Sequence, residues 1–493
     1  MDGDLLVIGG GINGAGIAAD AAGRGLKVIL CEKSDLAAAT SSASTKLIHG
    51  GLRYLEQYEF GLVRKSLEER EVLINAAQHI IKPLPIHIPL LPHSRSGLLI
   101  RAGLFLYDNL ARRRRFRGSR SIHINPTESP LNEAITRGFE YWDGATDDSR
   151  LVICNALQAA AHDARIFTRT EVTAIAPEEG GFEVSLSDHR RGTSRKIYVR
   201  GIVNAAGPWA ARVKGLLHAG REPLQLRLVR GSHIVVPKLY DGIQAYLLQH
   251  HDGRVIFVIP YQRHYSLIGT TEADFDGNLD DVDVTSEEVR YLMSVVNLYF
   301  KKSILEHEVV KTFAGVRPLV DESGKEASKV SRDYELRLEH SPQPFLSVYG
   351  GKLTTYRIVA EAAINQLGRF FPRMKPPWTR KAKLPGGDFD LPESLFRDIA
   401  TRYAWLGPDL ITRWQQNYGT LIYDILGDAK SMADLGVNFG HQLYKREVDY
   451  LHRKEWAFTA EDILWRRTKL GYLFKKKERL SLDNYLEQIG SNR

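Results

Sequence analysis

The sequence predicts an α/β protein with a doubly wound parallel sheet, a second, antiparallel sheet with helices, and an all-helical C-terminal region. Three observations lead to this prediction. Residues 4–32 read as strand, glycine turn, helix and strand, residues 224–271 alternate in short apolar segments, and residues 393–493 carry helical periodicity throughout. The first pattern is typical of parallel sheets, the second of antiparallel sheets, and the third of helical domains.

The N-terminal stretch carries the glycine spacing of dinucleotide-binding proteins. The apolar strand Leu5–Ile8 leads into Gly9, Gly11 and Gly14, which match the G-x-G-x-x-G pattern. The first glycine permits a tight turn, the second lets the backbone approach a pyrophosphate, and the third lets the helix lie close to the strand. Glu32 ends the next strand, where a carboxylate accepts hydrogen bonds from an adenosine ribose. Together these features predict a Rossmann-like unit that binds NAD or FAD.

Length and composition narrow the class of protein. A chain of 493 residues is too long to fold around a single hydrophobic core, so we expect two or three domains. Only Cys31 and Cys154 are cysteines, which argues against a disulfide framework and against a zinc or other metal site. The chain enters its first strand at once and contains no apolar run of 18 residues, so we expect neither a targeting peptide nor a membrane span. The net charge of +8 is clustered and points to an anionic surface or an anionic substrate.

The loop at Ala37–Leu55 has the composition of a cofactor-binding wall. Small residues with hydroxyl groups suit a chain that wraps closely around phosphates and a ring system, although a flexible linker has a similar composition. His49, Arg53 and Tyr54 favour a site wall over a linker. The expected cofactor contacts in this loop are Thr40, Ser41, Ser42, Ser44, His49 and Gly50.

A second strand and glycine turn occur late in the chain. Phe345–Tyr349 is an apolar strand that opens into a glycine pair and a helix extending to about Phe370. This helix N-terminus is also expected to point at the cofactor. Another buried strand ends in a Gly-Pro turn at Gly207. The expected contacts in the second turn are Gly350, Gly351, Lys352, Leu353 and Thr354.

Two segments between these motifs allow more than one interpretation. The prolines of Pro83–Pro92 predict irregular or edge-strand structure. Gly97–Asn109 is apolar at helical spacing and is followed by Arg112–Arg115. This basic amphipathic block either lies on an anionic bilayer or forms a surface helix with a solvated arginine tail.

Several long motifs resemble the FAD-dependent (aerobic, respiratory) glycerol-3-phosphate dehydrogenase family, and the resemblance covers essentially the whole chain. The motifs are IGGGINGAGIAADAAGRG, TSSASTKLIHGGLRYLE, RGFEYWDG, RGSHIVVP, GVRPL, GGKLTTYR and DILWRRTKLG. The resemblance implies oxidation of sn-glycerol 3-phosphate to dihydroxyacetone phosphate, with hydride transfer from C2 to N5 of FAD and electrons passed on to a membrane quinone. Neither a histidine nor a cysteine directly follows the first acid, so we expect non-covalent FAD.

The expected substrate carries a dianionic phosphate, which calls for fixed cations, and arginine suits phosphate because its fork donates two parallel hydrogen bonds. The candidates are Arg53, Arg317, Arg332 and Lys352. The resemblance implies that they lie at the substrate, with Tyr54 as a further hydrogen-bond donor or a packing partner of the flavin. Lys352 also suits stabilisation of negative charge on the reduced cofactor.

Oxidation at C2 also requires a group that takes the hydroxyl proton. Histidine is the usual supplier, and His233, at the start of an apolar strand, is the first candidate, with His49 second. Arg317 is the alternative, because a guanidinium can polarise the hydroxyl and stabilise developing negative charge. The sequence does not separate these roles.

Three other functions are compatible with parts of the sequence. An oxidase of the same architecture would pass electrons to oxygen, and an amino-acid or hydroxy-acid oxidase would use the arginines for a carboxylate. An RNA-binding FAD protein would place aromatic residues among its basic ones as stacking platforms, and Arg112–Arg115 lacks them, so we expect no nucleic-acid partner. We expect instead a cytoplasmic homodimer that binds the inner face of the cytoplasmic membrane peripherally.

The expected domain division is discontinuous. Residues 1–75, 145–212 and 345–372 are assigned to the FAD domain, 76–144 and 213–344 to the substrate-binding domain, and 385–493 to the helical C-terminal domain. Within the last, Thr459 begins a segment that places Ile463, Arg467, Leu470 and Phe474 on one helical face. Its basic flank either docks on anionic lipid or contacts the flavin domain.

Overall fold

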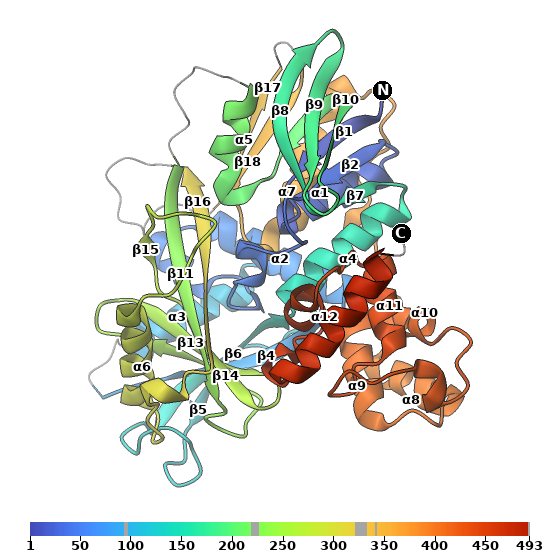
Figure 1. The fold of residues 1–493 in the computed structure, drawn as a ribbon. Helices are drawn as coiled ribbons and strands as arrows, with labels where there is room; N and C mark the ends of the chain where they lie inside the picture. The colour runs from blue at the N-terminus through green and yellow to red at the C-terminus, as the bar shows by residue number, and fades with distance from the viewer. Residues whose placement is uncertain (93–96, 218–225, 321–332, 341–342, 492–493) are drawn as a thin grey trace.

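The computed structural model describes residues 1–92, 97–217, 226–320, 333–340 and 343–491. Two sheets and a group of C-terminal helices make up this part of the chain (Figure 1). Sheet A lies at the top of the view, sheet B at the left and below, and the helices at the lower right.

Sheet A contains the parallel strands that the sequence predicts. Their order is β18 (Phe345–Gly350), β10 (Thr193–Asn204), β1 (Gly3–Ile8), β2 (Val28–Cys31) and β7 (Arg165–Phe167). Leu5 and Val7 of β1 pack on helices α1 (Ile12–Gly23), α4 (Asp148–Ala161) and α7 (Tyr356–Leu367). Leu6 and Ile8 face the other way, towards the hairpin of β8 (Thr170–Glu178) and β9 (Gly181–Asp188). Because both faces are covered, these strands are continuously apolar.

One edge strand of sheet A comes from a segment that was assigned from the sequence to the substrate-binding domain. β17 (Tyr334–Glu339) pairs antiparallel with β18, so it belongs to sheet A. The division from the sequence assigned residues 213–344 to the substrate-binding domain. We keep that division as a proposal, with β17 moved to the FAD domain and β3 (Leu47–Ile48), which pairs with β6 (Arg137–Thr146) of sheet B, moved to the substrate-binding domain.

Sheet B is antiparallel except where β12 meets β4. Its order is β15 (Ala273–Asp274), β11 (Leu226–Pro237), β14 (Tyr265–Gly269), β13 (Val255–Tyr261), β12 (Ala245–Gln249), β4 (Ile81–Pro89), β6 (Arg137–Thr146) and β3 (Leu47–Ile48), with β16 (Lys311–Val320) on β11 and β5 (Arg120–His123) on β6. Helix α6 (Ser286–Tyr299), which is capped by Thr285, covers one face. Helices α2 (Phe60–Ala76) and α3 (Gly97–Asn109) cover the other.

The proline-rich strand β4 is an inner strand, so the prediction of irregular or edge structure was wrong. β4 pairs with β6 along its whole length, and Leu90 directly after it still donates to Arg137 O. Because backbone groups alternate in direction along a strand, the three prolines at 83, 85 and 89 all turn their missing N–H towards β12. His87 points its backbone groups to the same side as these prolines. It is not a proline, so it has an N–H group at the position where β4 pairs with β12. The prolines therefore interrupt only the side on which pairing is brief.

The C-terminal helices form a core of their own around Trp414. They are α8 (Pro392–Arg402), α9 (Pro408–Tyr418), α10 (Ile422–Leu426), α11 (Lys445–Lys454) and α12 (Lys476–Ser491). Between α11 and α12, Thr459 and Asp462 exchange the expected capping hydrogen bonds. The helix that follows is a short π-helix, Asp462–Arg467, and Lys469 turns into the left-handed region with φ of 59°. The continuous helical face expected from Ile463 to Phe474 was therefore wrong.

Buried ion pairs join the C-terminal helices to sheet A. Arg467 donates both guanidinium ends to Asp35, at 2.7 and 2.8 Å, and Arg466 donates to the same carboxylate. On α4, Arg150 pairs with Glu455, and both side chains are fully buried. Of the two interpretations of the basic C-terminal segment, contact with the flavin domain is therefore the one observed for Arg466 and Arg467.

The remaining described helix of sheet A is α5 (Ala210–Leu217). None of the helices in the described ranges combines the length and apolarity needed to cross a lipid bilayer.

His79, buried between α2, α4 and the segment that leads to α8, predicts a pH dependence of stability. Burial, followed by the charges of Arg150 and Lys82, lowers the pKa of His79 to about 3. The unfolded chain, with an ordinary histidine pKa near ~6.5, binds this proton more readily, so stability falls as pH decreases from 6.5 towards 3. His79→Gln should remove about 2 kcal/mol of the change in unfolding free energy between pH 6.5 and 5. Denaturant titrations at both pH values measure it.

The exposed His307→Gln is the matched control and should leave that difference unchanged. An equal pH dependence in His79→Gln and the parent would show that His79 does not bind its proton differently in the folded and unfolded chains.

Candidate functional site

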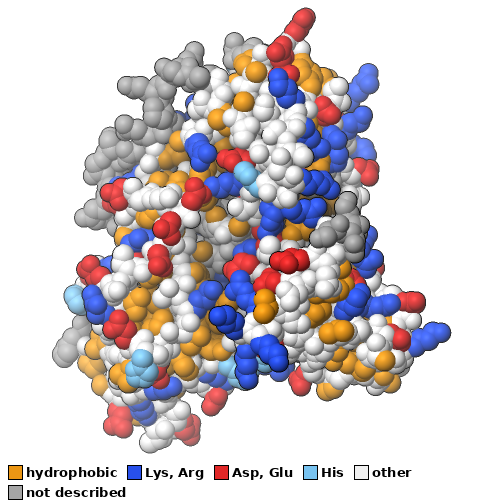
Figure 2. All heavy atoms as spheres, in the orientation of Figure 1, with side chains coloured by type: hydrophobic (Ala, Val, Ile, Leu, Met, Phe, Trp, Pro, Cys, Tyr) orange, Lys and Arg blue, Asp and Glu red, His pale blue; other side chains and the backbone are white. Residues whose placement is uncertain are grey.

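A cavity of about 960 Å³ lies at the carboxyl ends of β1 and β10, between the two sheets and the C-terminal helices. The face drawn in Figure 2 is hollowed in its middle, with Lys and Arg side chains gathered beside the hollow. In an open α/β sheet, ligands bind where the chain leaves neighbouring strands in opposite directions. The cavity occupies that position, and its volume is at the upper end of the range for cofactor pockets.

The N-terminal glycines allow backbone segments to approach more closely than any side chain permits. An added Cβ at Gly14 would lie 1.9 Å from Gly9 O, and one at Gly9 would lie 2.5 Å from Ala205 O. Gly9 also has φ of 112°, in the region that favours glycine. At Gly11 an added Cβ would lie 3.0 Å from Ser41 Oγ. The turn therefore directs the N-terminus of α1 into the cavity.

Glu32 holds this turn in place. Its carboxylate accepts hydrogen bonds from Gly10 N at 2.7 Å and from Ser34 N at 2.8 Å. Burial raises the pKa of Glu32, and these two backbone donors oppose the rise. The side chain lines the cavity, so its remaining lone pairs face the place expected for a ribose. Support of the turn is a role that the sequence did not reveal.

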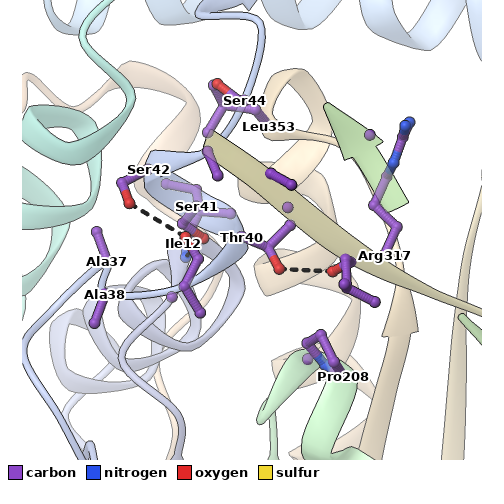
Figure 3. A pocket seen from close by; sticks show the side chains of 18 of the residues that line it. Ile12, Ala37, Ala38, Thr40, Ser41, Ser42, Ser44, Pro208, Arg317 and Leu353 are labelled. Atoms are coloured by element: carbon purple, nitrogen blue, oxygen red, sulfur yellow. Dashed lines mark hydrogen bonds between the residues drawn. The ribbon is translucent and has the colours of Figure 1, made fainter. Parts of the chain in front are cut away.

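The hydroxyl groups of the loop at Ala37–Leu55 bind protein atoms as well as lining the cavity (Figure 3). Thr40 donates to Val316 O at 2.6 Å, and Ser41 Oγ accepts from Ile12 N at 2.9 Å. Ser42 donates to Ala39 O, and Ser44 donates to Asp148. These bonds fix the loop between α1, β16 and α4, so its backbone and small side chains form one wall.

The second glycine turn forms another wall. Gly350 and Gly351 have φ of 66° and 84°, and both line the cavity together with Lys352, Leu353 and Thr354. Thr354 Oγ1 accepts from His49 N at 3.0 Å, which joins the two predicted cofactor segments. Gly207 also lines the cavity, whereas Gly50 lies behind it and donates to Tyr107 OH.

Three of the predicted cations line the same cavity as Tyr54. They are Arg53, Arg317 and Lys352. Arg53 lies 3.4 Å from Glu272, and Lys352 Nζ lies 3.6 Å from the centre of the Tyr54 ring. Burial lowers the pKa of Arg317, and no carboxylate in the described part of the chain forms an ion pair with it. Arg332 lies outside the described residues.

His233 lies deep in the cavity wall and is uncharged near neutral pH. Burial, and then the charges of Lys46 and Arg317, lower its pKa to about 3. Its ring stacks on Phe313 with 5.0 Å between centroids, and Nε2 lies 2.9 Å from Thr45 Oγ1. The ring thus starts in the protonation state that a base requires. His49, the second candidate, also lines the cavity.

Several cavity residues were missed by the sequence interpretation. On the sheet side they are Thr45, Lys46 and Glu272, and on the C-terminal side Glu461, Trp465, Arg466, Lys469 and Tyr472. Some of them lie within motifs quoted above, Thr45 and Lys46 in TSSASTKLIHGGLRYLE and Trp465, Arg466 and Lys469 in DILWRRTKLG. No local pattern shows that they share a cavity, because they become neighbours only when distant segments meet. Within the described residues, no group of three or more His, Cys, Asp or Glu side chains is placed to hold a metal ion.

Comparisons with known proteins cover the whole chain. Residues 4–357 match a family model described as FAD dependent oxidoreductase, and residues 377–491 match one described as C-terminal domain of alpha-glycerophosphate oxidase. A glycerol-3-phosphate dehydrogenase from Pseudomonas aeruginosa is 50% identical over 98% of this chain and 95% of its own length. A D-erythritol 1-phosphate dehydrogenase from Brucella abortus is 47% identical over 94% of each chain.

A solved structure shares the fold as well. It is the glycerol-3-phosphate dehydrogenase from Bacillus halodurans complexed with FAD, with a TM-score of 0.75 and 25% identity over 99% of this chain and 94% of that one. The residues of the cavity fit FAD. Gly11, which precedes α1, supplies no side-chain cap, and Ser41 occupies only Ile12 N, so the next N–H groups of the first turn are expected to bind a pyrophosphate, with Glu32 at the ribose end.

The position of Glu32 predicts its effect on cofactor retention. Glu32→Ala removes both the support of the glycine turn and the expected ribose acceptor. Hydrogen bonds to a charged group contribute about 1.5–3 kcal/mol each, so FAD affinity should fall about tenfold or more. The flavin-to-protein ratio after gel filtration, from absorbance, measures it. Glu335→Ala, on the exposed edge of sheet A, is the control, and undiminished flavin in Glu32→Ala would mean that the ribose contact is not made there.

Proposed function

This chain belongs to the family of FAD-dependent oxidoreductases, and on that premise we propose that it is a glycerol-3-phosphate dehydrogenase. It oxidises sn-glycerol 3-phosphate at C2 to dihydroxyacetone phosphate. The observation that carries the proposal is the convergence of Arg53, Arg317 and Lys352 on one cavity. The full-length similarity to glycerol-3-phosphate dehydrogenases supports the same substrate.

The cations suit a small phosphorylated alcohol. A dianionic phosphate needs more than one fixed positive charge, and here the three cations come from different parts of the chain. Arg317 is the one expected to bind the substrate most directly, because it lines the cavity and no described carboxylate pairs with it. Arg53 lines the cavity, lies 3.4 Å from Glu272, and is expected to contribute a second positive charge to the phosphate site. Tyr54 is expected to orient the ammonium group of Lys352, which lies over the face of its ring.

The oxidation requires removal of a proton from the C2 hydroxyl. The chemistry that FAD supplies when bound is acceptance of the hydride from C2. His233 is our first choice for the proton, because it is neutral, and Arg317 is positioned to stabilise negative charge on the oxygen. The low pKa of His233 in the free protein is expected to rise when the substrate phosphate offsets the charges of Lys46 and Arg317.

We propose a membrane quinone as the acceptor and peripheral binding to the inner face of the cytoplasmic membrane. Helix α3 supports this proposal, because one side of it packs inward through Ile100, Leu104 and Tyr107, whereas four large apolar side chains remain exposed. These are Leu98, Leu99, Phe105 and Leu106, exposed by 83%, 62%, 62% and 44%. Exposed arginines at 112 and 114 lie directly beyond the helix. Such a face suits an anionic bilayer. The homodimer expected from the sequence stays a prediction.

A second substrate has support from one comparison. The relative from Brucella abortus that is 47% identical is named for D-erythritol 1-phosphate, which is a longer polyol phosphate. The cations described above suit either phosphate, so the two substrates must be compared directly.

Anaerobic reduction of the bound flavin tests the proposed activity. Glycerol 3-phosphate should bleach the purified holoprotein, and a quinone should restore the yellow colour faster than air does. Arg317→Ala should keep bound FAD but slow the bleaching about 10²–10³-fold, the usual cost of a lost charge-stabilising donor. Arg64→Ala, an exposed arginine on α2, is the control. Bleaching by D-erythritol 1-phosphate alone would show that this compound is the substrate. Reoxidation that is faster with air than with quinone would show that the protein is an oxidase.

Sedimentation with vesicles tests the α3 surface. The parent should bind vesicles of phosphatidylcholine with 30% phosphatidylglycerol. Changing Leu98, Leu99, Phe105 and Leu106 to serine should weaken binding at least ~10-fold, since burying one such side chain contributes about 1.5–3 kcal/mol. Turnover with a soluble dye should persist, because these side chains point away from the cavity. Ile243→Ser together with Leu480→Ser, also exposed, is the control. Unchanged binding in the α3 variant would exclude this helix as the membrane contact.

A further inference from the structure

A buried carboxylate, Asp148, joins the loop of the cavity wall to the first turn of α4. It is fully buried and ion-paired with Lys46. Asp148 Oδ2 accepts hydrogen bonds from Lys46 Nζ and Ser44 Oγ, both at 2.7 Å, and Oδ1 accepts from Ser149 N at 2.9 Å. Neither the sequence motifs nor the proposed reaction assigns this residue a role.

Asp148 is charged in the folded protein. Burial alone would raise the pKa of Asp148, but Lys46 and Lys469 together with the hydrogen bonds hold it below the usual value. Lys469 comes from the C-terminal domain, where it donates to Ser149 Oγ at 2.9 Å and to Asp147 at 3.0 Å. The carboxylate is therefore fixed by groups from three separate segments of the chain.

The two residues that Asp148 holds lie on either side of Thr45. Thr45 Oγ1 is 2.9 Å from Nε2 of His233. The histidine ring itself has little freedom, because it stacks on Phe313, and a Cβ added to Gly269 on its other side would meet the ring at 2.1 Å. The position of the loop therefore decides whether the threonine hydroxyl reaches the imidazole.

We propose that Asp148 is a positioning residue for His233 and acts through Thr45. By holding Ser44 and Lys46, it keeps the Thr45 hydroxyl on Nε2 and so fixes the tautomer and orientation of the imidazole. The proposal rests on the proposed function, in which His233 handles the hydroxyl proton. A misplaced group of this kind costs rate rather than affinity.

Stopped-flow reduction of the holoprotein by glycerol 3-phosphate tests the coupling. Asp148→Asn and Thr45→Val keep the shapes of their side chains, and each should slow flavin reduction about 10–100-fold. Flavin content and the substrate concentration for half-maximal rate should stay within about twofold. Because both substitutions act on the same contact between Thr45 and His233, the double variant should reduce its flavin no more slowly than the slower single variant. Asp163→Asn, the same change at an exposed residue just beyond the end of α4, is the matched control, and its flavin should be reduced at the parental rate.

A spectroscopic readout separates positioning from general damage. In ¹⁵N-histidine-labelled holoprotein, the Nε2 resonance of His233, assigned by its loss in His233→Gln, should shift in Asp148→Asn and in Thr45→Val but not in Asp163→Asn. Parental rates in Asp148→Asn, additive losses in the double variant, or an unshifted resonance would overturn the proposal. If Asp148→Asn fails to fold, Thr45→Val alone decides by the same two measurements. Failure of the parent to be reduced by glycerol 3-phosphate would instead reject the proposed function.

Discussion

The close approach of α1 to β1 is the constraint on which the rest of the site depends. Gly14 and Gly9 leave no room for a side chain, and Ala205, after β10, closes against the same turn. This contact fixes where the N-terminus of α1 opens and therefore where the cavity lies. The hydroxyl-rich loop and the second glycine turn are then attached to it through Ser41 and through the His49–Thr354 contact.

Buried charge determines how the C-terminal domain is oriented. The pairs of Arg467 with Asp35 and of Arg150 with Glu455 are almost completely buried. Desolvation offsets most of what such pairs contribute to stability, whereas their geometry is exacting. We therefore interpret them as devices that specify one docking position. That position brings Trp465, Lys469 and Tyr472 to the cavity, so the helical domain is part of the site.

The fold was largely predictable because its signals are local. The strand, glycine turn and helix at residues 4–32 and the helical periodicity of α3 depend on near neighbours in sequence. The position of β4 was predicted wrongly because each proline was read as a sign of edge or irregular structure. Pro83, Pro85 and Pro89 all point to the same side of the strand, so the other side can still pair fully with β6. The glycines and cations of the site could be named from motifs, although the roles assigned to them stay predictions. Asp148 and Glu272 lie outside those motifs, and Thr45 lies within one, but the roles of all three could not be predicted because their partners are distant in sequence.

The dependence of the cavity on Arg466, Arg467 and Lys469 has a consequence for biogenesis. Arg467 and Lys469 are synthesised long after their partners, which are Asp35 and Asp147, 432 and 322 residues earlier in the chain. Sheet A can form as soon as β18 has emerged, but one wall of the cavity is still missing then. The cavity therefore closes only when this late segment has docked, and a chain in which it has not yet docked has an open, unfinished pocket.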